Sequence, residues 1–350
     1  MSKSIKTIFL ATATAFALCL KLVIPPMGIY HGAFPGFGST EDVVTCRAIR
    51  NFEKMAGKRL AWAYFSNNWT GGIKFPEKQI REIVNCGSVP FIRIMPRSNF
   101  EFGPEKVYTL QAIIEGKFDG QLRQWARRAK ELGFPLLLDF AVEMNGDWFG
   151  WSGIYNGGSQ TDGYGDPTVP DGPERYRDAY RHIIEIFRSE GVYNVTWFFH
   201  PNSESFPDED WNRMENYYPG DEYIDWIGIS LYGPIFPQEK KYWDQLNFAE
   251  RLQKVLKEIQ TFAPAKPIAI LEFAVIEDER KPEWIRQAFE AIRSHPRIKA
   301  ISWWNERWIN EDGSISDLRI NSSPEALQEY RLQAKRTLLL PFCLFLTLFR

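Results

Sequence analysis

Histidine and cysteine are scarce in this chain of 350 residues, with four of each. The histidines are widely spaced, and none stands in an H-E-x-x-H pattern or beside a cysteine cluster. This scarcity argues against a catalytic zinc ion and against a thiol protease. No glycine-rich phosphate loop follows the first apolar run, which also argues against dinucleotide binding. We therefore expect neither a metal nor another cofactor.

The chain also lacks an excess of charge of either sign. Its 42 Lys and Arg residues are balanced by 44 Asp and Glu residues, which leaves a formal charge of −2. Too little positive charge is available to neutralise phosphates, so we do not expect a nucleic-acid partner. What is abundant is aromatic: 15% of the chain, including 13 Trp and 14 Tyr. Tryptophan and tyrosine in such numbers suggest solvent-exposed surfaces on which flat, amphipathic side chains have a role.

No apolar run reaches the roughly 20 residues that a membrane-spanning helix needs. At the N-terminus, Lys3 and Lys6 precede an apolar run over residues 8–20, and Ala15-Phe16-Ala17 resembles a cleavage site. We interpret residues 1–26 as a signal peptide, or alternatively an N-terminal anchor, of a secreted or cell-envelope protein. Residues 336–350 form an apolar C-terminal tail to which we assign no role. Either end offers a route to membrane association.

Two cysteines, Cys46 and Cys86, fall in the central part of the chain. If the protein is exported, the oxidising environment allows these two cysteines to form a disulfide. Each, however, lies in a helical pattern, and buried free thiols are common. We expect two unpaired thiols, with the bridge as the alternative.

Residues 27–335 alternate between short apolar runs and helical stretches. The eight apolar runs cover residues 28–34, 60–65, 89–95, 135–142, 195–199, 226–231, 267–273 and 298–304. Several are almost continuously apolar, as parallel strands buried on both faces are. Eight such runs alternating with helices predict an α/β fold of the (β/α)8 TIM barrel type, forming one catalytic domain. We expect a monomer.

Two of the intervening stretches show an apolar face at helical spacing. The residues on these faces are Tyr176, Tyr180, Ile183, Ile184 and Phe187 in one, and Phe248, Leu252, Val255, Leu256 and Ile259 in the other.

Glutamates follow two of the predicted strands. Glu143 comes after the fourth apolar run, and Glu272 comes near the end of the seventh. Active sites of these barrels lie at the carboxyl ends of the strands. A carboxylate placed in that partly desolvated mouth is costly unless it has a partner or a task. Strands four and seven lie across the barrel from each other, so the pair suits glycoside hydrolysis, which uses two carboxylates. A structural ion pair is the alternative for each.

Tryptophans gather at the same predicted ends. Trp148 and Trp151 lie in the loop after the fourth run, and Trp303 and Trp304 end the eighth. Flat aromatic faces pack against the C–H face of a sugar ring, so these residues are candidates for substrate binding. Because strand residues alternate in direction, one of Trp303 and Trp304 must point toward the helices, and we expect Trp304 to face the site.

Three further polar residues are candidates. His200 and Asn202 follow the fifth run, and we interpret them as substrate contacts. Arg93, in the third run, suits either a contact to sugar, a support for the charge of Glu272, or a structural role.

Several segments together resemble glycoside hydrolase family 26, the β-mannanase family. The segments are Phe140-Ala141-Val142-Glu143-Met144-Asn145-Gly146-Asp147-Trp148, Tyr180-Arg181-His182-Ile183, Pro201-Asn202, Tyr218-Pro219-Gly220-Asp221 and Leu271-Glu272-Phe273. The resemblance implies a (β/α)8 barrel and a reaction that retains anomeric configuration. It also implies that Glu143 is the acid/base, that Glu272 is the nucleophile, and that Tyr232 hydrogen-bonds the nucleophile.

The chain departs from the characterised mannanases of that family at Val142, where they carry histidine. The resemblance therefore implies an endo-acting β-glycosidase acting on a β-linked polysaccharide or oligosaccharide, with β-1,4-mannan as the first interpretation. A β-1,3-1,4-glucanase is the alternative within the family, which also includes enzymes acting on β-1,3-xylan. A non-catalytic carbohydrate-binding protein on a glycosidase barrel is the alternative from another class.

The same positions predict unequal acidity for the two glutamates. Desolvation and the facing negative charge of Glu272 should raise the pKa of Glu143 above its usual value. With Tyr232 as a donor, Glu272 should remain ionised at lower pH.

Overall fold

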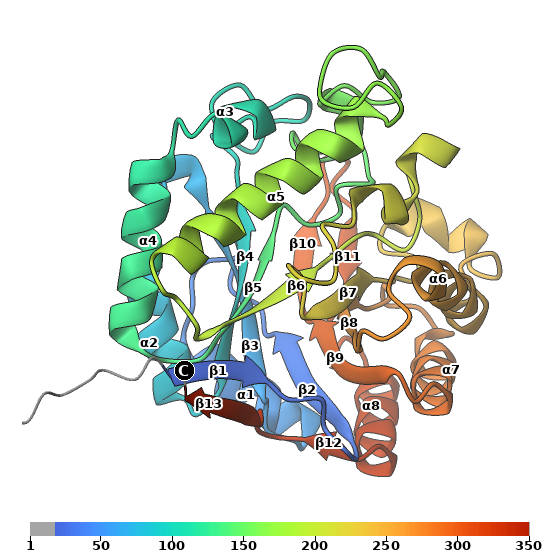
Figure 1. Ribbon diagram of the computed structural model, residues 1–350. Coiled ribbons are helices and arrows are strands. Elements are labelled where there is room, and N and C mark those ends of the chain that lie inside the picture. The colour runs from blue at the N-terminus through green and yellow to red at the C-terminus, as the bar shows by residue number, and fades with distance from the viewer. Residues whose placement is uncertain (1–17, 350) are drawn as a thin grey trace, which may run out of the picture.

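The computed structural model of the protein describes residues 18–349. Its centre is a closed barrel of eight parallel strands, each hydrogen-bonded to the next, with the last strand paired to the first (Figure 1). The strands are β2 (Ile29–Phe34), β3 (Trp62–Asn68), β4 (Val89–Met95), β5 (Leu136–Phe140), β6 (Val195–Phe199), β7 (Trp226–Ser230), β8 (Ile268–Phe273) and β9 (Ile298–Trp304). Each of the eight predicted runs overlaps one of them, so the predicted (β/α)8 barrel is confirmed.

Helices surround the barrel (Figure 1). They are α1 (Cys46–Ala56), α2 (Glu77–Asn85), α3 (Leu110–Ile114), α4 (Asp119–Leu132), α5 (Asp171–Ser189), α6 (Phe248–Phe262), α7 (Lys281–Ser294) and α8 (Pro324–Arg336). Between β6 and β7 the connection contains two short 3₁₀ turns, η3 (Asp210–Asn212) and η4 (Met214–Tyr217). The remaining 3₁₀ turns are η1 (Trp69–Gly71), η2 (Gly153–Tyr155) and η5 (Pro237–Tyr242).

The apolar faces of α5 and α6 are the ones that the spacing predicts. All five of the predicted face residues are buried in α5, and in α6 only Leu256 is half-buried. Side-chain caps fix where several helices begin: Thr45, for example, accepts a hydrogen bond from the backbone of Ala48 at the start of α1.

Strands from the two ends of the described chain lie at the end of the barrel where its strands begin (Figure 1). There β1 (Leu18–Leu22) pairs antiparallel with β13 (Phe345–Phe349), and β12 (Leu339–Leu340) pairs parallel with β2. The backbone N–H of Leu22 donates to Thr196 Oγ1 at 2.9 Å. Residues 1–17, which hold most of the predicted signal peptide, lie outside the described residues. The division of the chain at residues 26 and 336 stays a prediction.

Cys46 and Cys86 form a disulfide, with their Cα atoms 5.5 Å apart. The expectation of two free thiols was wrong. Each cysteine does belong to a helical segment, since Cys46 begins α1 and Cys86 caps the end of α2. The pattern along the chain carried no signal that these two helix ends meet across the barrel surface.

A hairpin of β10 (Arg307–Ile309) and β11 (Ile315–Asp317) follows β9 (Figure 1). Within residues 18–349, none of the helices combines the length and the apolar character needed to cross a membrane.

Candidate active site

The carboxyl ends of the barrel strands open into a cleft of about 640 Å³. Its lining combines charged and aromatic residues from the ends of the strands and from the loops that follow them. Among them are Glu41, Arg93, Glu143, Trp148, Asn202, Tyr232, Glu272 and Trp304. The two glutamates of the sequence analysis therefore share one cavity.

Glu272 lies near the end of β8 and is only 4% exposed. Its Oε2 accepts a hydrogen bond from the Tyr232 hydroxyl at 2.7 Å, as the resemblance implied. Its Oε1 accepts from Arg93 Nη1 at 2.8 Å and from the Tyr64 hydroxyl at 3.0 Å. Three donors, one of them a cation, hold this buried carboxylate in a fixed orientation and favour its ionised form against the cost of burial.

Glu143 lies just beyond β5, where the backbone bends sharply. Both Ala141 and Glu143 adopt left-handed backbone conformations, with φ values of 50° and 56°. Non-glycine residues rarely adopt such values, and the cost is met by surrounding contacts. The Glu143 N–H donates to the carbonyl of His200 at 2.7 Å. This bend directs the carboxyl group into the cleft rather than along the strand.

The carboxyl group of Glu143 has two neutral donors. Trp148 Nε1 donates to Oε2 at 2.8 Å, and Asn202 Nδ2 lies 3.3 Å from Oε1. Both donors come from loops, since Trp148 follows β5 and Asn202 follows β6. Trp148 and Asn202 thus contact the predicted acid/base itself, in addition to lining the cleft.

Burial raises the pKa of both glutamates. For Glu272 the positive charge of Arg93 opposes this rise, while the negative charge of Glu143 adds to it. Because Glu272 has a directly bonded cation and Glu143 has only neutral donors, we infer that Glu272 loses its proton first. The expectation for Glu143 agrees in direction. Desolvation at both strand ends was expected, but a raised pKa for Glu272 was not.

Beneath the cleft, a row of buried polar groups fills the barrel interior. The Tyr64 hydroxyl lies 3.3 Å from Asp139 Oδ2, which is 2.8 Å from His200 Nδ1. On its other side, His200 Nε2 lies 3.0 Å from Ser230 Oγ. Burial lowers the pKa of His200 to about 4, so this imidazole is neutral near pH 7. The row supports Glu272 from below through Tyr64.

His200 is fully buried within this row and does not line the cleft. Its predicted role as a substrate contact is therefore corrected to a position under the site. The reason is that His200 directly follows β6 and its side chain points into the barrel, where Asp139 and Ser230 bond both ring nitrogens.

Trp303 and Trp304 point in opposite directions, and Trp304 is the one that lines the cleft. Its ring stacks on Phe34 with centroids 4.0 Å apart, and the guanidinium of Arg93 lies 4.8 Å from its centre. Trp303 is buried, and its indole N–H donates to the carbonyl of Leu318 at 3.0 Å. Trp303 is thus removed from the candidates for substrate binding, because strand alternation places it among the helices.

Trp151 is also displaced from the cleft. It is 1% exposed, it stacks on Phe149 with centroids 4.4 Å apart, and its N–H donates to the carbonyl of Val142 at 2.8 Å. Trp151 lines a smaller pocket beside the cleft rather than the cleft itself, and its role in substrate binding stays a prediction. Its contact with Val142 holds the bend that leads to Glu143.

Sequence reasoning missed Glu41, a further carboxylate in the lining of the cleft, which also bonds Arg93. It lies in the loop after β2 with a left-handed φ of 62°. Its Oε2 accepts from Ser66 Oγ at 2.6 Å and from Arg93 Nη2. Arg93 therefore bridges Glu41 and Glu272. Glu41 lies seven residues after the end of β2, in an irregular loop. Neither a hydrophobic periodicity nor a position at a strand end therefore identified it from the sequence.

Comparison with known proteins supplies the family. Residues 108–306, more than half of the chain, match the model of "Glycosyl hydrolase family 26". The chain belongs to glycosyl hydrolase family 26. The matched region contains Glu143, Tyr232 and Glu272 and ends two residues beyond Trp304.

Curated relatives of this family 26 chain carry several names. It is 30% identical over 310 residues to Endoglucanase H of Acetivibrio thermocellus, a match that covers 87% of this chain and 30% of that protein. It is 26% identical over 179 residues to a mannan endo-1,4-β-mannosidase of Caldalkalibacillus mannanilyticus, covering 50% of this chain and 29% of that protein. The family 26 chain thus spans less than a third of the length of these relatives.

Solved structures share the fold of the family 26 chain. The catalytic domain of an endo-β-1,4-mannanase from Bacillus sp. JAMB-750 superposes with a TM-score of 0.63 at 19% identity. That match covers 88% of this chain and 86% of the other. A mannanase of Bacillus subtilis gives a TM-score of 0.58 at 16% identity, covering 89% and 86%. Because the sequence identities are below 20%, these similarities show a shared barrel fold and nothing further.

Proposed function

We propose that the protein hydrolyses internal bonds of a β-linked polysaccharide by double displacement, with Glu272 as nucleophile and Glu143 as acid/base. The observation that carries the proposal is the pairing of two buried carboxylates in one cleft with donors of different charge. Membership of family 26 supports it. No step requires a group beyond the chain and water.

In the first step, a carboxylate oxygen of Glu272 attacks the anomeric carbon of the sugar. As the bond from that carbon to the bridging oxygen breaks, Glu143 gives its proton to the leaving oxygen. Arg93, Tyr64 and Tyr232 orient Glu272 for this attack. The flat face of Trp304 offers a surface for the sugar ring undergoing reaction.

In the second step, Glu143, now ionised, takes a proton from water while that water attacks the anomeric carbon. The bond to Glu272 breaks and the carboxylate returns to its starting state. Two displacements leave the product with the configuration of the substrate. Burial of Glu143 suits its two roles, since this carboxyl group must be neutral in the first step and ionised in the second.

For the substrate we propose a β-glucan ahead of the β-1,4-mannan of the sequence analysis. Two observations support this order: Val142 stands where characterised mannanases carry histidine, and the endoglucanase match covers 87% of the chain against 50% for the mannosidase. Mannan is the second candidate, favoured by the mannanase names among relatives and solved structures.

The decisive experiment pairs a panel of glycans with a nucleophile variant. The unmodified chain should release reducing sugar fastest from mixed-linkage β-glucan, and faster release from mannan would reverse the proposed order. Glu272→Ala should lose at least about a thousandfold in kcat. Azide should then partly restore turnover and yield a product of inverted configuration, because one displacement has replaced two. Near-native activity without azide would refute the assignment. Retention by a polysaccharide that is never cleaved would support the binding-protein alternative.

We also propose that the protein is exported. The charged and apolar pattern before residue 20 supports this, as does the disulfide, which is typical of oxidising compartments. We place the cut after Ala17 rather than at residue 26, because such a cut leaves whole the strand β1, which begins at Leu18. N-terminal sequencing of protein recovered outside the cell should begin at Leu18, and recovery of only the uncut chain inside the cell would overturn the proposal.

A further inference from the structure

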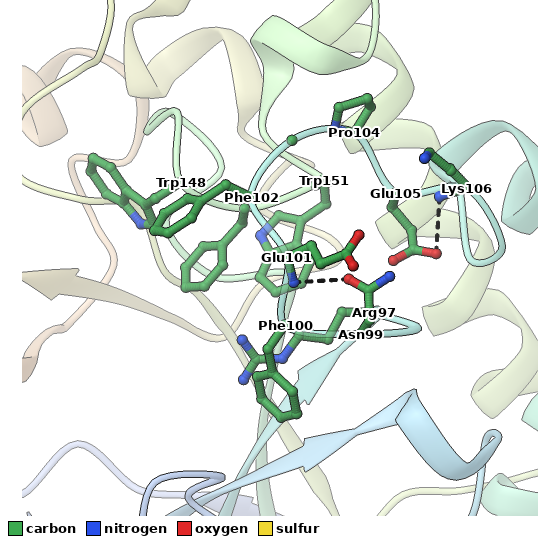
Figure 2. Close-up of a pocket in the computed structure, with 13 residues that line it drawn as sticks. Arg97, Asn99, Phe100, Glu101, Phe102, Pro104, Glu105, Lys106, Trp148 and Trp151 are labelled. Atoms are coloured by element: carbon green, nitrogen blue, oxygen red, sulfur yellow. Dashed lines mark hydrogen bonds between the residues drawn. The ribbon is translucent and has the colours of Figure 1, made fainter. Parts of the chain in front are cut away.

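A second pocket opens beside the catalytic cleft, with a volume of about 420 Å³. We call it the Phe100 pocket. It is formed by residues 97–106, which follow β4, and by residues 148–151, which follow β5 (Figure 2). Three of its lining residues, Phe102, Trp148 and Phe149, also line the catalytic cleft. The two cavities are therefore continuous along one aromatic wall.

Hydrogen bonds within the loop over residues 97–106 hold it in a defined conformation. The carboxylate of Glu105 accepts backbone hydrogen bonds from Ser98, Lys106, Val107 and Tyr108 at 2.7 to 3.1 Å. The Glu105 N–H in turn lies 3.4 Å from the carbonyl of Gly150. A Cβ on Gly150 would meet the Glu105 nitrogen at 2.6 Å, so glycine is needed for this close approach of the two loops.

The surface of the pocket is aromatic and open to solvent. Phe102 is 84% exposed and Phe100 is 50% exposed, although exposure of large apolar rings has a cost in water. Arg97 lies with its guanidinium carbon 4.3 Å from the centre of the Phe100 ring, and its Nε donates to Asn68 Oδ1 at 2.6 Å. Figure 2 shows these groups around one opening, with Asn99 and Glu101 beside them.

An aromatic ring next to hydrogen-bonding side chains is the chemistry that recognises a sugar. The ring packs on the C–H face of a pyranose, while guanidinium, amide and carboxylate groups reach its hydroxyls. Continuity with the cleft points to one occupant. A polysaccharide chain seated across Glu143 and Glu272 has further sugar units to place, and the shared wall of Trp148 and Phe102 leads to this pocket.

We propose that the Phe100 pocket is a distal subsite that binds a sugar unit of the polysaccharide outside the catalytic cleft. This inference rests on the proposed function and deepens it. Such a subsite makes the protein selective for longer polysaccharide chains, because a short oligosaccharide fills the cleft without reaching Phe100.

The test compares chain lengths in a variant that cannot cleave. In the Glu272→Ala background, affinity is measured for trisaccharide and hexasaccharide fragments of mixed-linkage β-glucan and of mannan. Adding Phe100→Ala should lower the preference for the hexasaccharide over the trisaccharide by about fivefold to tenfold. Phe100→Tyr keeps the ring and should restore the preference. Phe342→Ala removes a similarly exposed phenylalanine, 56% exposed in the tail, and is the matched control.

An unchanged preference in Phe100→Ala, with its melting temperature also unchanged, would overturn the subsite. Equal loss in Phe342→Ala would overturn it too. Hydrolysis by the unmodified chain, measured in parallel, separates this failure from failure of the proposed function: cleavage with an unchanged preference refutes only the subsite. Absence of cleavage of every glycan refutes the proposed function. Absence of hexasaccharide binding together with cleavage by the unmodified chain refutes only the subsite.

Discussion

The two carboxyl groups in the cleft differ chiefly in the charge of the groups that bond them. Glu272 accepts a hydrogen bond from the guanidinium of Arg93, whereas the groups that donate to Glu143, among them an indole and an amide, are uncharged. Burial raises the pKa of both, and the positive charge of Arg93 opposes this rise for both, but only Glu272 bonds the guanidinium directly. Two coupled groups titrate in two steps that belong to the pair. The first proton lost should be that of Glu272.

This order predicts a bell-shaped dependence of activity on pH. The active form has Glu272 ionised and Glu143 protonated, so the rate falls as acid protonates Glu272 and as base ionises Glu143. In Glu143→Ala the alkaline limb should disappear, and kcat on the polysaccharide should fall by about 10² to 10⁴. A dinitrophenyl glycoside, whose leaving group needs no proton, should still form the glycosyl-enzyme rapidly. Stopped-flow release of dinitrophenolate measures this step.

Slow reaction of the activated substrate together with a retained alkaline limb would contradict the role of Glu143. Glu306 is then the next carboxyl group to test, because burial raises its pKa and it lies two residues after the end of β9.

Glu41 provides a prediction about the acidic limb. Its negative charge shares Arg93 with Glu272. Glu41→Gln removes a negative charge near Glu272 and leaves Arg93 with one anionic partner, so the pKa of Glu272 should fall. The acidic limb of kcat/KM should move to lower pH, by between a few tenths of a unit and about one unit. Glu325→Gln, at an exposed position in α8, is the control. An acidic limb that stays in place would show that Glu41 does not act on Glu272.

At the scale of elements, the disulfide joins the start of α1 to the end of α2 across a separation of 40 residues. Closing a loop of that length in the unfolded chain contributes about 4 kcal/mol in the chain-entropy treatment. The double variant Cys46→Ser with Cys86→Ser should lose up to this amount of unfolding free energy in a denaturant titration. Dithiothreitol should lower the melting temperature of the unmodified chain but leave the double variant unaffected. Equal melting of the unmodified chain with and without reductant would contradict a stabilising bridge.

The strands were predictable because burial on both faces leaves a direct trace in the sequence. β8 is the clearest case, since its predicted run is apolar up to Glu272 and every residue of the strand is buried. The amphipathic faces of α5 and α6 are similarly local. Glu143 and Glu272 were located because each falls at a strand end, a place that the barrel itself turns toward the cleft.

The parts that escaped prediction depend on contacts between distant segments. Glu41 reaches the cleft only because its loop folds back over Ser66 and Arg93. Trp151 and His200 were placed by sequence proximity to the cleft, yet each side chain turns to a buried partner, Val142 for one and Asp139 for the other. The periodicity of the sequence does not indicate either of these side-chain directions.

For the molecule as a whole, the barrel has one functional end and one closed end. The cleft and the Phe100 pocket lie where the strands end. The strands β1, β12 and β13 lie where the barrel strands begin (Figure 1). Tyr30, near the start of β2, ties the closed end together, because its hydroxyl donates to the carbonyl of Val23 and accepts from the N–H of Leu344. Stability and catalysis should therefore be separable by substitutions at the two ends.

A pair of neighbouring leucines tests this separation. Leu339 is 4% exposed in β12, whereas the preceding Leu338 is 58% exposed. Leu339→Ala should lower the unfolding free energy by about 2 to 3 kcal/mol, because it removes buried methyl groups beneath the barrel. Leu338→Ala should change it by less than about 0.5 kcal/mol. Both variants should keep the kcat/KM of the unmodified chain at a temperature where all three are folded. Equal stability of the two variants in denaturant titrations would mean that β12 is dispensable, and a loss of kcat/KM in the folded Leu339→Ala protein would mean that the closed end communicates with the cleft.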